Sequence, residues 1–268
     1  MAGREMGTMK NKNLKPMWVL FRKELGIAKQ PTYWASCLFM GGLMVWLYVY
    51  TPVETIKTTA QASPQIAAYL ANSYPQMFAL LQPCWLFLLT WSFLAAEVFA
   101  REKMDGRLEM LMTSPLYLRE IWIAKCLALF VLVYPYVLLV SGLVFGLQAQ
   151  VWPSQLGISP DINIATQLTA LVVGPLLAFG VSALLGLLTF IVTNVNTFQS
   201  ISFFLTFAIG FGGNYALSAL QENAMNNLSA LIVWPVVGIY LLIGLVVWAI
   251  VGLLLRGLDK DRVVTHLT

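Results

Sequence analysis

Between Cys126 and Leu255 the sequence holds only two charged residues, Asp161 and Glu222. In a soluble domain about a quarter of all residues are charged, whereas in this chain the charged share is 10% and the hydrophobic share is 59%. Apolar runs of about 20 residues cross a bilayer as helices, because a helix satisfies its own backbone hydrogen bonds. We therefore predict an integral membrane protein with an all-α fold.

Polar interruptions divide the sequence into six predicted membrane-spanning helices. They cover residues 33–50, 77–98, 121–148, 166–193, 198–220 and 228–255. Two polar stretches are predicted as external loops: residues 51–77, with a partly helical section at 65–70, and residues 150–165. Gly174-Pro175 predicts a kink in the fourth span, because proline cannot donate the backbone hydrogen bond that a helix needs.

The residues before the first span predict an amphipathic helix on the membrane surface. Residues 1–13 are polar and basic, and residues 14–30 carry apolar side chains at three- and four-residue spacing. The apolar positions are Leu14, Trp18, Phe21, Leu25 and Ala28, and the basic residues among them are Lys15, Arg22, Lys23 and Lys29. Such a helix lies in the headgroup layer with its basic side chains toward anionic lipid.

The distribution of positive charge predicts the side of the membrane on which each connection lies. Of sixteen basic residues, only Lys57 falls outside the N-terminal segment, residues 96–125 and the tail 256–268. Positive residues concentrate in cytoplasmic connections. Both termini and residues 96–125 are therefore predicted to be cytoplasmic, with the six-helix domain 31–255 in the plasma (inner) membrane.

The sequence lacks the motifs of a self-sufficient pump or enzyme. It contains no Gly-x-x-x-x-Gly-Lys-Ser/Thr loop for nucleotide phosphates and no His-Glu-x-x-His zinc motif. Its cysteines, Cys37, Cys84 and Cys126, form no CxxC pair. We predict that the chain is no enzyme and binds neither a metal nor another cofactor. Because the predicted spans also lack a central coupling charge, the energy for transport is expected from a soluble ATPase.

Residues 96–125 are the charged island between the second and third spans, and residues 97–120 are the predicted coupling segment. Gly106 permits a sharp turn. Leu108, Leu111 and Met112 follow at i, i+3, i+4 spacing, which gives an apolar patch suited to a groove on a soluble partner. The charged residues around this patch, which fix the register of such a contact, are Glu102, Arg107 and Glu109.

The end of the island predicts the start of the third span. Ser114 has the side chain of a helix N-cap, and Pro115 suits the first helical position. Lys125 follows as the last basic residue before the long apolar sequence.

The island resembles the signature region of ABC-2 type permeases, the membrane subunits of many bacterial ATP-binding-cassette exporters. Family members read Glu-x-x-x-Gly-Thr-Leu-Glu-x-Leu-Leu-x-Ser-Pro, then a basic–acidic pair and a lysine that opens the third span. The matching residues are Glu102, Gly106, Leu108, Glu109, Leu111, Ser114, Pro115, Arg119, Glu120 and Lys125. Two departures are mild: Arg107 replaces a common threonine, and Met110-Leu111-Met112 replaces a leucine run.

The resemblance implies an exporter subunit that moves a drug, peptide, lipid or glycan out of the cytoplasm. Its partners would be cytoplasmic ABC ATPase subunits, which bind ATP and Mg²⁺, and a second permease subunit, with no role for nucleic acid. The turn 193–197, through Asn194 and Asn196, is either a further ATPase contact or a plain connector. Two alternatives remain: an ATPase-coupled part of a gliding-type machine, and an ATP-independent scaffold or receptor.

Polar and small residues within the predicted spans have two possible uses. The polar side chains of the fourth and fifth spans line a substrate path or bond across helices; they are Thr189, Gln199, Ser202, Thr206 and Asn214. The pairs Gly142/Gly146 and Ser182/Gly186 allow close helix contact. Packing within one subunit is the commoner use of such pairs, and contact between two subunits is the alternative.

Overall fold

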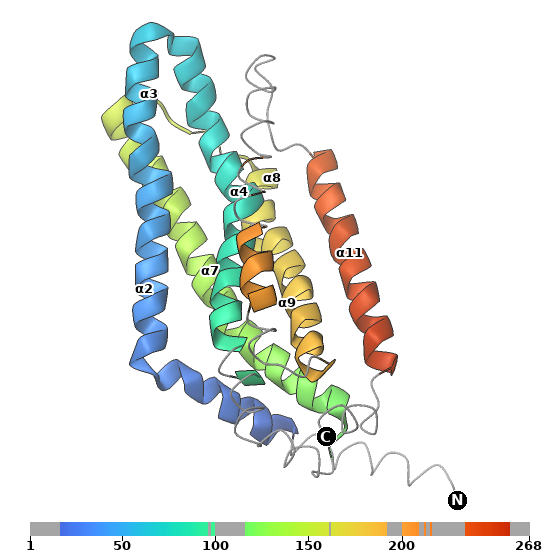
Figure 1. The fold of residues 1–268 in the computed structure, drawn as a ribbon. Helices are drawn as coiled ribbons and strands as arrows, with labels where there is room; N and C mark the ends of the chain where they lie inside the picture. Colours follow the sequence, from blue (N-terminus) through green and yellow to red (C-terminus); the bar gives the residue numbers. More distant parts are fainter. Residues whose placement is uncertain are drawn as a thin grey trace, which may run out of the picture.

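A computed structural model describes residues 17–95, 98–99, 116–160, 162–191, 200–208, 212, 215 and 234–257. Within these ranges the chain is almost entirely helical and forms no β-strand. The predicted all-α class is therefore confirmed for this part of the chain. Figure 1 shows the long helices side by side, with the N-terminal helix across the lower end of the bundle.

Five helices in the described ranges are long and apolar enough to cross a membrane. They are Pro31–Ala62, Pro64–Ala95, Leu118–Leu156, Ile164–Leu188 and Val237–Gly257. Five of the six predicted spans coincide with these helices, which indicates a membrane protein. The remaining prediction, residues 198–220, is described only at 200–208, 212 and 215.

The N-terminal helix comprises residues 17–29 and ends where the chain turns into the bundle. Residues 17–24 are α-helical and continue into the 3₁₀-helix η1 (Leu25–Lys29). Gln30 then takes an extended conformation, with ψ at 127°, and Pro31 occupies the first turn of α2. Proline suits that position because a first-turn N–H has no helical partner. The Trp34 indole braces the bend by donating to the Ala28 carbonyl at 2.7 Å.

The first spanning helix is much longer than predicted, and the predicted loop 51–77 is wrong. Helix α2 (Pro31–Val45) runs through a π-helical turn, η2 (Trp46–Tyr50), into α3 (Thr51–Ala62) without a break. Only Ser63 is extended before α4 (Pro64–Ala95) begins. A 32-residue helix is about 48 Å long, whereas a bilayer core is about 30 Å thick. The α3–α4 hairpin therefore extends the bundle at its upper end (Figure 1).

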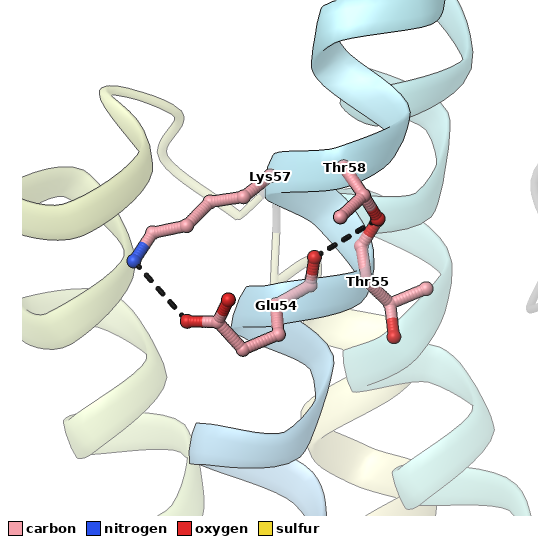
Figure 2. A network of polar contacts seen from close by, with 4 residues as sticks. All are labelled: Glu54, Thr55, Lys57 and Thr58. Atoms are coloured by element: carbon pink, nitrogen blue, oxygen red, sulfur yellow. Dashed lines mark hydrogen bonds and ion pairs between the residues drawn. The ribbon is translucent and has the colours of Figure 1, made fainter.

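Packing explains why this polar stretch is helical. Val53 and Ile56 are buried in a small cluster with Ala67, Ala71 and Trp152. On the other side of α3, threonine hydroxyls donate back to the helix, as Thr58 does to the Glu54 carbonyl at 3.1 Å. Figure 2 shows this bond beside the Glu54–Lys57 contact. A composition typical of loops is overridden by apolar residues at helical spacing.

Helix α7 (Leu118–Leu156) extends beyond the predicted third span at both ends. Its N-cap is Tyr117, whose backbone N–H donates to the Glu120 carboxylate at 2.9 Å. Ser114 is thus not the N-cap of this helix, although Ser114 and Pro115 themselves lie outside the described residues. The helix ends before Gly157, which takes a left-handed conformation with φ of 66°. Glycine adopts this conformation without steric cost.

The remaining helices complete the bundle. Asn163 caps the short helix α8 (Ile164–Leu168), which continues through the π-helical turn η4 (Thr169–Val173) into α9 (Gly174–Ile191). Helix α11 (Trp234–Gly257) ends the described chain. Helix α4 contacts α3, α7 and α9, whereas α11 packs on α9. Burial follows this order: 83% of the apolar window of α4 is buried in the protein, but only 11% of that of α11.

Two prolines leave backbone carbonyls without their usual helical N–H donor, and side chains of a neighbouring helix donate hydrogen bonds to these carbonyls. Pro52 has no N–H for the Tyr48 carbonyl four residues earlier, and the Gln148 amide donates to this oxygen at 2.8 Å. Pro175 likewise has no N–H for the Leu171 carbonyl, and the Tyr134 hydroxyl donates there at 2.9 Å. In a membrane interior every backbone group needs a partner inside the protein, so these bonds make the irregular turns tolerable.

Candidate functional site

The structure describes few of the predicted coupling and path residues. The side chains of Lys125, Ser202 and Thr206 are described, and Thr189 is described only as a position in α9. The other predicted residues lie outside the described ranges: Glu102, Gly106, Arg107, Leu108, Glu109, Leu111, Met112, Ser114, Pro115, Asn194, Asn196, Gln199 and Asn214. The candidate site is therefore built from the helix ends that flank the island.

Lys125 lies at the lower end of the bundle and is fully buried, with 0% of its side chain exposed. Its ammonium donates to the Glu24 carboxylate at 2.8 Å and to the Val98 carbonyl at 2.9 Å. It also lies 5.6 Å from the centre of the Phe99 ring. Lys125, which is predicted to begin the third span, is thus the centre of a buried polar cluster and not an exposed surface charge.

Three separate segments contribute to this cluster, which we call the joint and define as Glu24, Val98 and Lys125. Glu24 comes from the N-terminal helix, Val98 follows the end of α4, and Lys125 comes from the first turns of α7. Backbone carbonyls and carboxylates both accept hydrogen bonds from an ammonium group. The Lys125 ammonium binds one group of each kind, the Glu24 carboxylate and the Val98 carbonyl.

Apolar packing surrounds the joint. Leu20, Leu116, Ile121 and Ala124 are buried together, with Met17 and Phe21 packed against them. One face of the N-terminal helix therefore rests on the start of α7. Trp18 and Val19 point away from this contact and are exposed, by 50% and 67%. The exposed side is consistent with the predicted membrane-surface helix.

Sequence reasoning missed Glu24, although the sequence carried a signal. Met17, Leu20, Phe21 and Glu24 recur at i, i+3, i+4 and i+7, so Glu24 falls on the buried stripe of its helix. The predicted apolar face, Leu14, Trp18, Phe21, Leu25 and Ala28, shares Phe21 with this stripe but does not include Leu20 or Glu24. A carboxylate on an apolar stripe is costly to bury unless it has a partner, and the partner lies 101 residues later in the sequence.

A cavity of about 160 Å³ lies beside the N-terminal helix, between α2 and α4. Gln30, Thr32 and Ser36 give it polar groups near the start of α2, and Met40, Leu89 and Phe93 give it apolar walls. Phe93 also makes an edge-to-face contact with Phe203 of the predicted fifth span, at 5.3 Å between ring centres. The cavity thus combines polar and apolar surface, as an amphipathic ligand requires.

The predicted path residues with described side chains are buried rather than open. Ser202 and Thr206 are 2% and 0% exposed. The hydroxyls of Thr206 and Ser92 lie 3.2 Å apart, which ties the predicted fifth span to α4. Thr206 also donates to the Ser202 carbonyl at 2.8 Å. Bonding across helices, the second of the two predicted uses, describes Thr206 in this conformation.

The two small-residue pairs have different surroundings in the structure. Ser182 is fully buried, and a side chain at Gly186 would meet Trp122, Cys126 and Phe99 at 3.4–3.5 Å, so this pair serves packing within the chain. A side chain at Gly142 or Gly146 would meet no described atom within 4 Å. That face of α7 therefore serves no close helix contact within the described residues.

No group of three or more His, Cys, Asp or Glu side chains that could hold a metal ion occurs among the described residues. Comparison with protein-family models gave no match, and comparison with curated proteins found no similar sequence.

Proposed function

We propose that this chain is the membrane subunit of an ATP-binding-cassette exporter of the ABC-2 type. The observation that carries the proposal is the charged island between two apolar helices, with its family-like pattern from Glu102 to Lys125. The described helices α4 and α7, which flank the island, and the burial of Lys125 near the start of α7 support this interpretation. In this proposal six spans cross the plasma membrane, and both termini are cytoplasmic.

The energy for transport comes from partner ATPase subunits, which hold ATP and Mg²⁺. They contact the apolar patch Leu108–Met112, oriented by Glu102 and Glu109, and a smaller contact forms at Asn194 and Asn196. Closure of the ATPase then pushes on the lower end of the bundle, where α4 ends and α7 begins. A second permease subunit completes the transport path.

The cavity between α2 and α4 supports an amphipathic or hydrophobic substrate. Its lining combines polar side chains, such as Ser36 and Thr90, with apolar side chains such as Met40. Such a site takes a molecule that enters from the membrane rather than a free ion. The hydroxyls of Thr206 and Ser92 are hydrogen-bonded to each other. The cavity is therefore a better candidate for the first substrate contact than the predicted path residues of the fifth span.

The proposal is tested by purifying the tagged full chain from its native membrane in lipid nanodiscs. We expect an ABC ATPase to copurify, as identified by mass spectrometry, and the complex to hydrolyse ATP. Leu108→Asp and Glu109→Arg should each abolish the stimulated hydrolysis. Leu242→Ala on the exposed face of α11 is the matched control, and it should leave hydrolysis unchanged.

The outcomes also separate the alternatives. Hydrolysis without export of fluorescent amphiphiles from vesicles, in a complex that carries a large external assembly, favours a gliding-type machine. A chain that purifies without any ATPase is a scaffold or receptor, and the exporter proposal is then wrong. The coupling assignment alone is wrong when both island variants keep the ATPase bound and active.

A further inference from the structure

The joint holds three chain segments through one buried ammonium group. Glu24 and Lys125 are 6% and 0% exposed, and their charged atoms lie 2.8 Å apart. The Val98 carbonyl binds the same ammonium at 2.9 Å. The N-terminal helix, the segment just after α4 and the start of α7 therefore meet at the Lys125 Nζ atom.

Stability alone does not explain a charge pair at this position. The N-terminal helix already has an apolar contact with α7 through Leu20 and Phe21. A buried ion pair is often no more stabilising than apolar residues of the same size, because both charges lose their hydration. The pair fixes the register of the N-terminal helix on α7. If the helix shifted by one turn, both buried charges would lose their partner.

The N-terminal helix is also connected firmly to α2. The bend at Gln30 is closed by its N–H, which donates to the Ile27 carbonyl at 2.9 Å. The Trp34 indole bonds to the Ala28 carbonyl at 2.7 Å. Ile27 and Gln30 in turn line the cavity between α2 and α4. Any displacement of the N-terminal helix therefore reaches the wall of this cavity.

We propose that Glu24 and Lys125 are positioning residues that make the N-terminal helix, the segment at Val98 just after α4 and the start of α7 move as one body. A displacement of the α4–α7 end is then passed through the N-terminal helix to α2 and the cavity. The use of this route during transport rests on the proposed function. The rigid connection itself does not, and it is tested on the membrane subunit alone.

The experiment measures one distance in the full chain in lipid nanodiscs by electron paramagnetic resonance. Spin labels are placed at Val19→Cys and Leu127→Cys, which are 67% and 41% exposed, after Cys37, Cys84 and Cys126 are replaced by alanine. The labels report the position of the N-terminal helix relative to α7. A second label pair, Leu127→Cys with Leu242→Cys on α11, reports whether the bundle stays intact.

Two variants give the decisive comparison. With both charges present we expect one narrow distance distribution. Lys125→Met leaves Glu24 buried without a partner, so the Val19–Leu127 distribution should broaden about twofold, while the Leu127–Leu242 distance stays unchanged. In the double variant Glu24→Leu/Lys125→Met no charge is buried, so the thermal stability should recover, but the distribution should stay broad.

A purely structural pair predicts a different result. If the apolar double variant restores both the thermal stability and the narrow distribution, the charges only fill space and the positioning role is wrong. An unchanged distribution in Lys125→Met also overturns it, because lipid and apolar packing then hold the helix. Neither result depends on an ATPase or a substrate, so failure here is distinct from failure of the exporter proposal.

Discussion

Two Lys–Glu pairs at opposite ends of the bundle are built in contrasting ways. On α3, Glu54 and Lys57 lie three residues apart, with their charged atoms at 3.4 Å and their side chains 79% and 42% exposed. At the joint, Glu24 and Lys125 lie 101 residues apart, with their charged atoms at 2.8 Å and their side chains almost fully buried. The same two residue types thus form an exposed pair within one helix at one end and a buried tertiary contact at the other.

The difference lies in solvation and in what each pair connects. Exposed charges are hydrated with or without their partner, so their attraction adds little. Buried charges have given up hydration, so each depends on the other. The upper end of the bundle is held instead by apolar packing around Trp152 and by neutral hydrogen bonds to the backbone carbonyls of Tyr48 and Val49. A buried ion pair thus connects segments at the lower end, whereas apolar packing and neutral hydrogen bonds connect them at the upper end.

The largest effect is expected from Lys125→Met. The substitution leaves the Glu24 carboxylate and the Val98 carbonyl without their ammonium partner, which should lower the free energy of unfolding by about 3–5 kcal/mol. Thermal unfolding and denaturant titration of the purified full chain in mixed micelles measure it. A loss no greater than that of Lys57→Met would contradict the assignment of Lys125 as a buried tertiary contact.

A smaller loss is expected from Trp152→Phe at the upper end. The phenyl ring keeps most of the contact with Val53 and Ile56, but it lacks the indole N–H that donates to the Val49 carbonyl at 2.8 Å. The lost bond and the smaller ring should cost roughly 1–2 kcal/mol. Hydrogen exchange should rise in α3 and stay unchanged in the N-terminal helix. A rise at both ends would show that the two ends are not independent.

The sequence predicts the helical class and most of the spans because apolar length is a local property. Residues 121–148 and 228–255 are recognisable from composition alone, and both fall largely within observed helices. The error at residues 51–77 arose where composition and periodicity disagreed. Val53 and Ile56 are apolar at helical spacing, but they become informative only with Ala67, Ala71 and Trp152 beside them.

The joint could be predicted only in part, for the same reason. Lys125 was selected from its place at the start of the third span, and its contact with the end of the second span was not foreseen. Glu24 stood on the buried stripe of an amphipathic helix, which signals a buried partner, but the partner's identity depends on which helices meet. Tertiary pairing between residues 101 positions apart is not readable from one sequence.

A modest effect is expected from Gln148→Met, which keeps the volume of the side chain but removes its amide. The Tyr48 carbonyl, which Pro52 cannot bind, then loses its partner at 2.8 Å. Hydrogen bonds between helices in membranes average about 0.6 kcal/mol, and the loss in unfolding free energy should be of that size. Tyr136→Phe, which removes the bond to the Cys37 carbonyl, is the matched control and should cost less, because the Gly41 N–H can still bind that carbonyl within α2.

The smallest effect is expected from Lys57→Met, the same substitution as at Lys125 in a different environment. Lysine and methionine have similar helix propensities, so the change isolates the contact with Glu54. An exposed pair at i, i+3 contributes about 0.2–0.5 kcal/mol, and salt screens it. The loss should shrink further in high salt, whereas the loss for Lys125→Met should persist because salt does not reach a buried pair. Equal salt dependence of the two variants would show that water reaches the joint, and the contrast between the two ends would then have to be abandoned.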